Sequence, residues 1–486
     1  MNTAQHLQHL HWRAGFGPRP QDLAVAPNPR QALRQLLRDS AAYEPLDGPD
    51  LHYQEPPDEA MAVPAVAPAA TPAAPPTLRR RDLTPAQRKQ QNQDVKQVFA
   101  RMALAWMDRM ATSPAQLREK MTLFWHGHFA CRVRRPEAAL RLHNTTRQHA
   151  LGKFGDLLRA VSREPAILDF LNNRQNRRQH PNENFARELM ELFTMGRGQY
   201  TEQDVKEAAR AFTGWTYDAN GFKIKARDHD DGPKTFLGRT GNLTGDDVLA
   251  IILEQPATAT FIVTKIWRFF VSDTPDPARV APLADAFRRS DYDLTALMTS
   301  VFAADWFYEA AHVGSHLKSP VELLAGLRRT LGLTLDNPQP LLGYQRALGQ
   351  TLFQPPNVAG WPGGRAWIDS SSLLLRLQLP AILLRNADFP LALKQDENDL
   401  APNQTRAERT VGAGVGAHLP LAPLQKLLGA ATVTDAPKQL VSFILQAPIR
   451  PESLGLVQQA VAAAPPAEAL RIALLSLLSL PEYQLC

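Results

Sequence analysis

The chain has 486 residues, 44 % of them hydrophobic, which is enough for a sizeable packed core and excludes a wholly disordered protein. Its 54 Lys and Arg against 48 Asp and Glu give a net charge of +6, too little over this length to indicate nucleic-acid binding. Two cysteines exclude a disulfide framework and a cysteine-rich zinc site, so a metal would need His, Asp, Glu or Asn ligands.

The sequence carries no signal for membrane insertion or export. No stretch approaches about 18 uninterrupted apolar residues, so no membrane span is expected. Residues 1–17 lack both the basic start and the apolar core of a signal peptide. The sequence as written is therefore expected to stay in the cytoplasm, and a periplasmic or exported location would require a leader that has been removed.

The predicted elements are mostly helices. Thr84-Pro85 with Gln87 is typical of a capped helix start, and Ser113-Pro114 with Gln116 repeats that pattern. Apolar residues then recur at helical spacing in many further segments. These segments are 138–149, 154–171, 181–194, 201–211, 246 onward, 261–271, 294–308, 321–331, 373–384 and, as short helices, 437–480.

Three segments depart from this pattern. Residues 214–227 alternate in polarity around Asn220-Gly221, which predicts a β-hairpin. Residues 44–80 are rich in proline and alanine and are predicted to be a flexible, disordered insertion. Residues 386–420 lack periodicity and are predicted to be a long loop. The expected fold is mainly α, a large multi-helix body spanning 1–486 as a single domain.

The helix predicted over 181–194 carries the strongest local signal. At about 100° per residue, Glu188 lies at the edge of an apolar stripe, and Asn184 and Glu191 are its neighbours one turn away. A carboxylate that loses water at such a place needs a metal ion, an arginine or a polar substrate as its partner. The alternative is a solvated ladder of ion pairs in which Glu183, Arg187 and Glu191 follow at four-residue steps.

Two further segments are rich in metal-binding and acid–base side chains. His126 and His128 flank Gly127, and on an irregular turn both rings would share one face and bind one metal. On a regular helix they would point to different sides, and one would pack against its neighbours. The loop 229–234 offers His229 and Asp230 for a metal or an acid–base pair. Its Lys234 suits an anionic group, although surface turns with this composition are common.

Basic and aromatic groups complete the candidates. Arg174, Arg177, Arg178 and His180 directly precede the glutamate helix, where they could neutralise it or bind phosphate or sulfate. A second basic run covers residues 132–135, and either run could be simply solvated. Trp361 and Trp367 lie in a glycine-rich segment and could form a stacking surface for a sugar or a buried anchor.

Taken together, several motifs in a fixed order resemble the bacterial family catalogued as domain of unknown function eighteen hundred. These are Arg13–Gly17, Trp125–Phe129, Pro181–Leu192, Asp204–Trp215, His229–Lys234, Lys318–Glu322, Pro355–Trp361 and Leu480–Tyr483. The resemblance implies a mainly helical body and supplies no reaction. It implies that members are often exported, and that a sulfatase-like protein, whose gene often neighbours theirs, is a partner.

The resemblance favours joint action of the polar motif residues. The first hypothesis is a metal-assisted hydrolase or transferase acting on an anionic or glycan-type substrate, with zinc, manganese or iron as its divalent metal. Its metal ligands would be His126, His128 and Asp230; its catalytic residues Glu183, Glu188, Glu191, His229 and Lys234; and its substrate-binding residues Asn184, Arg187, Trp361 and Trp367. The alternatives are metal-free acid–base chemistry on a glycan and a non-enzymatic helical scaffold that binds the sulfatase-like partner.

Overall fold

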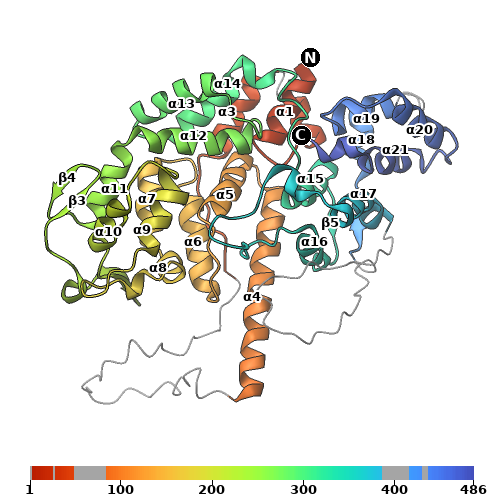
Figure 1. Ribbon diagram of the computed structural model, residues 1–486. Coiled ribbons are helices and arrows are strands. Elements are labelled where there is room, and N and C mark those ends of the chain that lie inside the picture. The colour runs from red at the N-terminus through yellow and green to blue at the C-terminus, as the bar shows by residue number, and fades with distance from the viewer. Residues whose placement is uncertain (1–2, 26–27, 49–83, 386–414, 430–435) are drawn as a thin grey trace.

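The computed structural model describes residues 3–25, 28–48, 84–385, 415–429 and 436–486, and within them the chain forms 21 α-helices (Figure 1). The first helices are α1 (Thr3–Arg13), α2 (Pro20–Val25), α3 (Pro29–Asp39), α4 (Pro85–Thr112), α5 (Gln116–His128), α6 (Pro136–Gln148), α7 (Phe154–Ser162), α8 (Pro165–Phe170), α9 (Asn184–Glu188), α10 (Glu202–Ala211) and α11 (Gly245–Glu254). They are followed by α12 (Pro256–Phe270), α13 (Pro277–Arg289), α14 (Leu294–Ala303), α15 (Pro320–Leu331), α16 (Pro340–Leu348), α17 (Ser370–Arg385), α18 (Leu421–Leu428), α19 (Ala436–Ile444), α20 (Pro451–Ala462) and α21 (Ala469–Leu478). The prediction of a mainly helical fold is confirmed.

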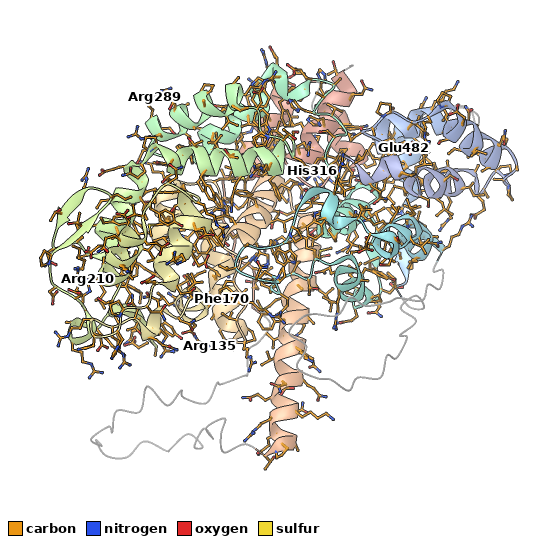
Figure 2. All side chains as sticks on the ribbon, viewed as in Figure 1. Arg135, Phe170, Arg210, Arg289, His316 and Glu482 are labelled. Atoms are coloured by element: carbon orange, nitrogen blue, oxygen red, sulfur yellow. The ribbon has the colours of Figure 1, made fainter. Side chains whose placement is uncertain are left out.

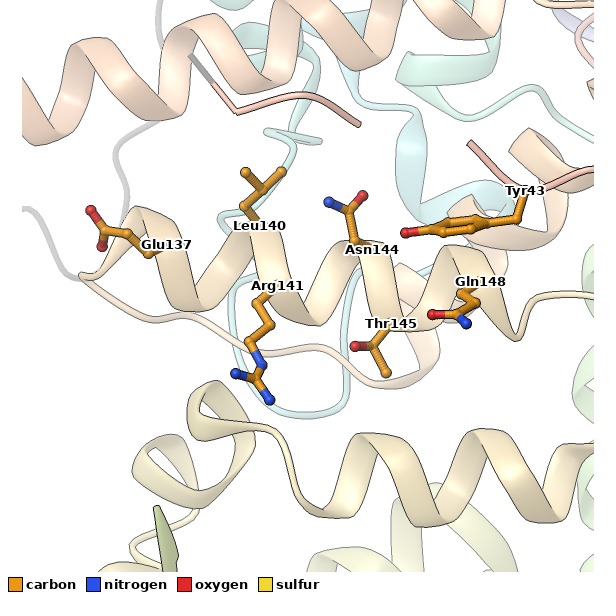
Figure 3. Close-up of a pocket in the computed structure, with 7 residues that line it drawn as sticks. All are labelled: Tyr43, Glu137, Leu140, Arg141, Asn144, Thr145 and Gln148. Carbon is orange, nitrogen blue, oxygen red and sulfur yellow. The ribbon is translucent and has the colours of Figure 1, made fainter. Parts of the chain in front are cut away.

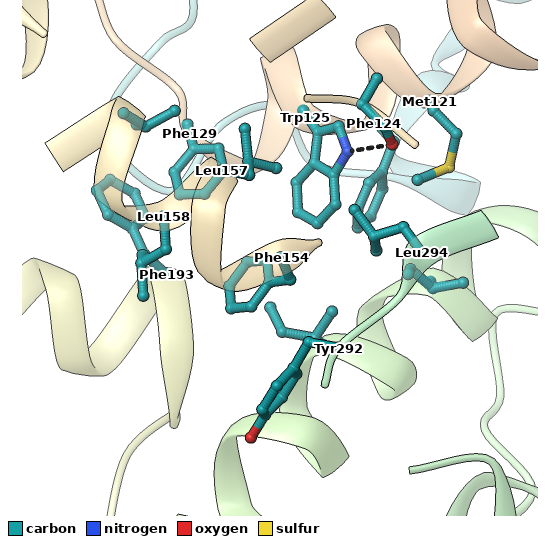
Figure 4. Packing of buried hydrophobic residues seen from close by; sticks show 14 of the residues in the cluster. Met121, Phe124, Trp125, Phe129, Phe154, Leu157, Leu158, Phe193, Tyr292 and Leu294 are labelled. Atoms are coloured by element: carbon teal, nitrogen blue, oxygen red, sulfur yellow. Dashed lines mark hydrogen bonds between the residues drawn. The ribbon is translucent and has the colours of Figure 1, made fainter. Parts of the chain in front are cut away.

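The buried apolar side chains form two clusters. The first is built largely by α5–α14, and the second by α4 together with α15–α21. Helix α1 contributes to both, because Leu10 packs in the first cluster and Trp12 in the second. Figure 4 shows the first cluster around Trp125, which is fully buried among Phe129, Phe154 and their neighbours and donates from Nε1 to the Ala150 carbonyl at 3.2 Å. The last turns of α5 lie where the two clusters meet, because Trp125 packs in the first cluster and Leu123 in the second.

Helix starts follow the sequence signals closely, with two exceptions. Thr84 forms the expected capping box at α4, and Thr201 caps the predicted start of α10 with a second one. Helix α5 begins only at Gln116, and no side chain caps its start; the Gln116 side chain instead donates to the Met110 and Ser113 carbonyls. The single helix predicted over 154–171 is two helices, because Pro165 cannot continue α7 and opens α8 instead.

The small amount of β structure lies in two-stranded sheets. Strands β1 (Trp215–Asp218) and β2 (Gly221–Ile224) form the predicted hairpin, with Asp218 opposite Gly221. Strands β3 (Lys234–Phe236) and β4 (Arg239–Gly241) follow it, and β5 (Thr334–Leu335) pairs with β6 (Ala417–His418). All three pairs are antiparallel. Each contains only two strands, so the described residues form no extended sheet.

The predicted insertion and long loop fall mostly outside the described residues. Their described ends are 44–48 and 415–420, and both carry structure. Leu46 is buried and exchanges two backbone hydrogen bonds with the Asn144 side chain, so the insertion begins later than residue 44. Strand β6 lies within 386–420, which corrects the prediction of loop throughout that range.

The described helices can be compared with a membrane-spanning helix in length and hydropathy. Within the described part of the chain, no single helix has the length and apolar character of a membrane span. Helices α11 and α12 pass that test only when taken together, across a bend of 74°.

Candidate functional site

The segment between α16 and α17 brings two motifs that are far apart in sequence into contact. In Figure 1 this teal segment loops from α16 towards α5 and α6 before it reaches α17. Gly360 adopts φ +82°, and a Cβ at this residue would lie only 2.3 Å from the carbonyl oxygen of Gly127. The ring of Trp361 lies 5.4 Å from the ring of His126. Only glycine at residue 360 permits this approach, because both the backbone conformation and the space exclude a side chain.

His126 serves this contact as a hydrogen-bond acceptor. The backbone N–H of Phe353 donates to its Nε2 at 3.0 Å, and the rings of Trp106 and Phe353 pack edge-on against it. Burial lowers the pKa of His126 to about 3, so the imidazole is neutral at physiological pH. This neutral form is the one that accepts from Phe353.

His128 points elsewhere. Helix α5 continues to His128, so the prediction of an irregular turn with both rings on one face is wrong. The Nε2 of His128 lies 3.0 Å from the Phe193 carbonyl oxygen, and burial is the main reason that its pKa is lowered well below the usual value. Across the residues that the structure describes, no group of three His, Cys, Asp or Glu side chains is arranged to hold a metal ion. Metal binding by His126, His128 and Asp230 would therefore require a different arrangement of these side chains.

The loop 229–234 is closed by its own hydrogen bonds. Asp230 forms an ion pair with Arg210 of α10 at 2.7 Å, and this partner is the main reason that the pKa of Asp230 is lowered. The Lys234 side chain is buried and donates from Nζ to the carbonyls of Asp230 and Gly232 at 2.5 and 3.0 Å. Burial lowers the pKa of Lys234. His229 lies 2.8 Å from the Thr213 carbonyl oxygen through Nδ1.

Helix α9 is shorter than predicted and runs into a π-helical turn. It begins at Asn184, not at Pro181, and the π-helical turn η4 (Leu189–Thr194) replaces its second half. Side chains engage two carbonyls near the end of this segment: that of Leu192 accepts from Lys265 at 3.1 Å, and that of Phe193 lies 3.0 Å from His128 Nε2. Single π-helical turns occur frequently at functional sites.

The glutamates of this segment form only part of the predicted ladder of ion pairs. Arg187 pairs with Glu183 at 3.0 Å, as the ion-pair alternative predicts, and also with Glu202 of α10 at 2.7 Å. Glu191 pairs instead with Arg197 at 2.5 Å, because the π-helical turn changes its direction. Asn184 is also engaged, since its amide donates to the Leu171 carbonyl at 3.1 Å.

Glu188 is the exception among these acids. It is half-buried, and no hydrogen bond or ion pair engages its carboxylate among the described residues. Burial and, after it, the charge of Glu191 raise the pKa of Glu188. In the folded state Glu188 therefore holds its proton to a higher pH than in the unfolded chain, and its contribution to stability falls as pH rises through that interval.

The variant Glu188→Gln should accordingly be more stable than the wild type at neutral pH. We expect a rise in Tm of no more than about 3 °C at pH 7 and no difference near pH 4, where the wild-type residue is also neutral. Thermal unfolding at both pH values checks this. Glu202→Gln is the matched control, because loss of its pair with Arg187 should leave the Tm at pH 7 unchanged or lower it. A lower Tm for Glu188→Gln at pH 7 would show that the carboxylate has a stabilising partner.

The two tryptophans differ in exposure. Trp367 is buried, with 6 % of its surface exposed, and acts as an anchor for the segment. Trp361 is half-buried beside His126. A sugar could therefore stack only on Trp361 without rearrangement of the chain.

The largest group of buried charges was not singled out in the sequence. Lys120 of α5 forms a buried ion pair with Glu322 of α15, and the two residues have 2 % side-chain exposure each. Lys318 donates to the Tyr483 carbonyl at 2.6 Å, and its Nζ lies 3.8 Å from the ring centres of both Trp12 and Tyr483. Burial lowers the pKa of Lys318 to about 7. The sequence did offer a signal for this group: the motifs Arg13–Gly17, Lys318–Glu322 and Leu480–Tyr483 each carry charged or aromatic residues.

An open groove of about 380 Å³ lies elsewhere, along α6 (Figure 3). Tyr43 and six residues of α6 line it, and the lining contains none of the predicted site residues. Arg141 and Thr145 in its wall both bind Glu164, at 3.0 and 2.7 Å. The groove therefore does not gather the motifs.

The fold and the site define a helical protein whose motif side chains chiefly bond to one another and to the backbone. The family model described as "Protein of unknown function (DUF1800)" matches residues 9–485, and the chain belongs to this family. No curated protein and no solved structure matches the chain.

Proposed function

We propose that this chain is a binding scaffold that holds a partner protein, and that the partner is the sulfatase-like protein implied by the gene neighbourhood of the family. The observation that supports a scaffold is that polar side chains of the motifs bond to other parts of the chain. His126, Asp230 and Lys234 each bind another part of the chain, and each of these contacts fixes a loop. A set of loops held in one conformation is suited to recognising a protein surface, because little ordering remains to be done on binding.

The start of α17 is the best candidate for the contact surface. Leu373 and Leu374 have 36 % and 51 % of their surface exposed, and they directly follow the segment that packs on α5. Neighbouring apolar side chains exposed at the surface can mark a protein-binding site when they belong to a larger apolar patch. The half-buried Trp361 belongs to the same segment.

The variant Leu374→Asp should weaken the complex with the sulfatase-like protein by at least about tenfold, because it places a charge in an apolar contact. Isothermal titration of the purified partner into the wild type and the variant measures this. Leu456→Asp is the matched control, since Leu456 has 66 % of its surface exposed on α20 and should have no effect. Equal affinities for the wild type and Leu374→Asp would reject this surface.

A second candidate function is metal-free acid–base chemistry on a glycan. It is favoured by the different environments of two neighbouring acids. The pKa of Glu188 is raised, whereas the carboxylate of Glu191 forms an ion pair with Arg197. The variant Glu188→Gln separates the two candidates. It should leave the complex with the partner unchanged under the scaffold proposal, and it should abolish glycan hydrolysis if the acid–base function is correct.

A further inference from the structure

Two arginine runs that lie about 40 residues apart meet at one tyrosine. Arg135 precedes α6, and Arg174 belongs to the short 3-10 helix η3 (Asn173–Gln175). Their guanidinium carbons lie 5.2 and 4.8 Å from the ring centre of Tyr217. Tyr217 donates to Asp169 at 2.7 Å, and Arg135 also contacts this carboxylate. Two guanidinium groups thus share one carboxylate at the surface.

The surroundings add positive charge. The segments 132–137 and 169–178 contain six arginines against two carboxylates, Glu137 and Asp169. Arg134, Arg177 and Arg178 are exposed, and no ion pair engages them among the described residues. Figure 2 labels Arg135 near the lower edge of the helical body in that view. Guanidinium groups present planar pairs of N–H donors that match the oxygens of phosphate and sulfate.

The backbone that carries Arg177 and Arg178 is fixed. The buried Asn176 amide donates to the Ala209 carbonyl at 2.8 Å, and its carbonyl oxygen accepts from the N–H of Asn182 at 2.9 Å. The N–H of Arg178 donates to the Asp228 carbonyl at 2.9 Å. The turn therefore presents its two exposed arginines from a defined position, and a ligand would not have to order it.

We propose that this arginine cluster binds a ligand that carries a tetrahedral oxyanion, a phosphate or a sulfate group. Arg177 and Arg178 supply the exposed guanidinium groups. Arg135, Arg174 and Tyr217 form the base of the site, and Asp169 holds that base together by accepting from Tyr217. This inference does not depend on the proposed partner, because it rests on a different surface from that of Leu374.

The test is titration of the full chain with inorganic phosphate, with inorganic sulfate and with sodium chloride at matched ionic strength. We expect phosphate, sulfate or both to raise Tm more than chloride does, by mass action on the folded state. The double variant Arg177→Gln/Arg178→Gln should weaken that anion by about tenfold or more, because it removes charge-assisted hydrogen bonds. Whichever anion responds identifies the group.

A matched control separates a site from general screening of charge. The double variant Arg268→Gln/Arg289→Gln removes the same charge from exposed residues of α12 and α13, and Arg289 is labelled at the opposite, upper side in Figure 2. It should bind the anion as the wild type does. Equal weakening in both double variants, or no shift beyond that with chloride, would overturn the proposal.

Discussion

The variant Glu322→Ala is expected to lose about 3–5 kcal/mol of unfolding free energy, which is a large fraction of the stability of an ordinary domain. Glu322 is the buried partner of Lys120 and also accepts from the N–H of Ser319 at 2.7 Å. Burial alone would raise its pKa, but Lys120 first, and after it His316 and the hydrogen bond from the Ser319 N–H, lower the pKa to about 2. Its removal leaves several buried cations without this counter-charge.

These cations explain why the effect should be large. Lys318 and Arg376 are fully buried near Glu322, and Lys120 donates to the Trp12 and Gly15 carbonyls at 3.1 and 2.9 Å. Carbonyl oxygens solvate a cation only in part, so a full negative charge must offset the remainder. Because Lys120 lies on α5, the loss of this charge also disturbs the helix that carries His126.

Chemical denaturation of the purified variants measures this loss. Glu254→Ala is the matched control, because Glu254 is an exposed partner of Arg239 and its loss should cost less than about 1 kcal/mol. The double variant Lys120→Met/Glu322→Gln should recover part of the stability, since it removes a cation together with the anion. If Glu322→Ala costs no more than Glu254→Ala, the buried network does not hold α1, α5 and α15 together.

The variant Gly360→Ala is expected to destabilise the protein by about 2–4 kcal/mol. The new Cβ would lie 2.3 Å from the Gly127 carbonyl oxygen, and φ +82° costs a non-glycine residue about 1–2 kcal/mol in addition to the overpacking. The segment must then move away from α5, so that Trp361 leaves His126. We expect a lower Tm together with a change in tryptophan fluorescence.

Gly127→Ala is the control on the other side of the same contact. A Cβ at Gly127 meets no atom within 4 Å, and alanine is the better helix former, so the variant should be neutral or slightly more stable. Equal Tm values for the two variants would show that the approach of Gly360 to α5 does not constrain the segment.

Sequence reasoning predicted the local structure better than the site. The capping box at Thr84, the helix start at Thr201 and the Asn220-Gly221 hairpin depend on residues within a few positions of one another, and all three are confirmed. The contact of His126 with the Phe353 backbone joins residues 227 positions apart, and no local pattern encodes it.

The departures of the site from prediction have two physical origins, irregular backbone and packing between distant segments. The π-helical turn at Leu189–Thr194 rotates Glu191 towards Arg197, and an assumed period of 3.6 residues cannot show this. The meeting of Arg135 and Arg174 at Tyr217 likewise depends on how α6, η3 and β1 pack. Motif order marks the residues that matter, and only packing shows whether they bind a ligand or one another.

The most direct test of the scaffold proposal is the molar mass, by light scattering, of an equimolar mixture of this chain with the proposed sulfatase-like partner. The account predicts a single species whose mass is the sum of one copy of each protein. Two species at the separate masses would contradict it.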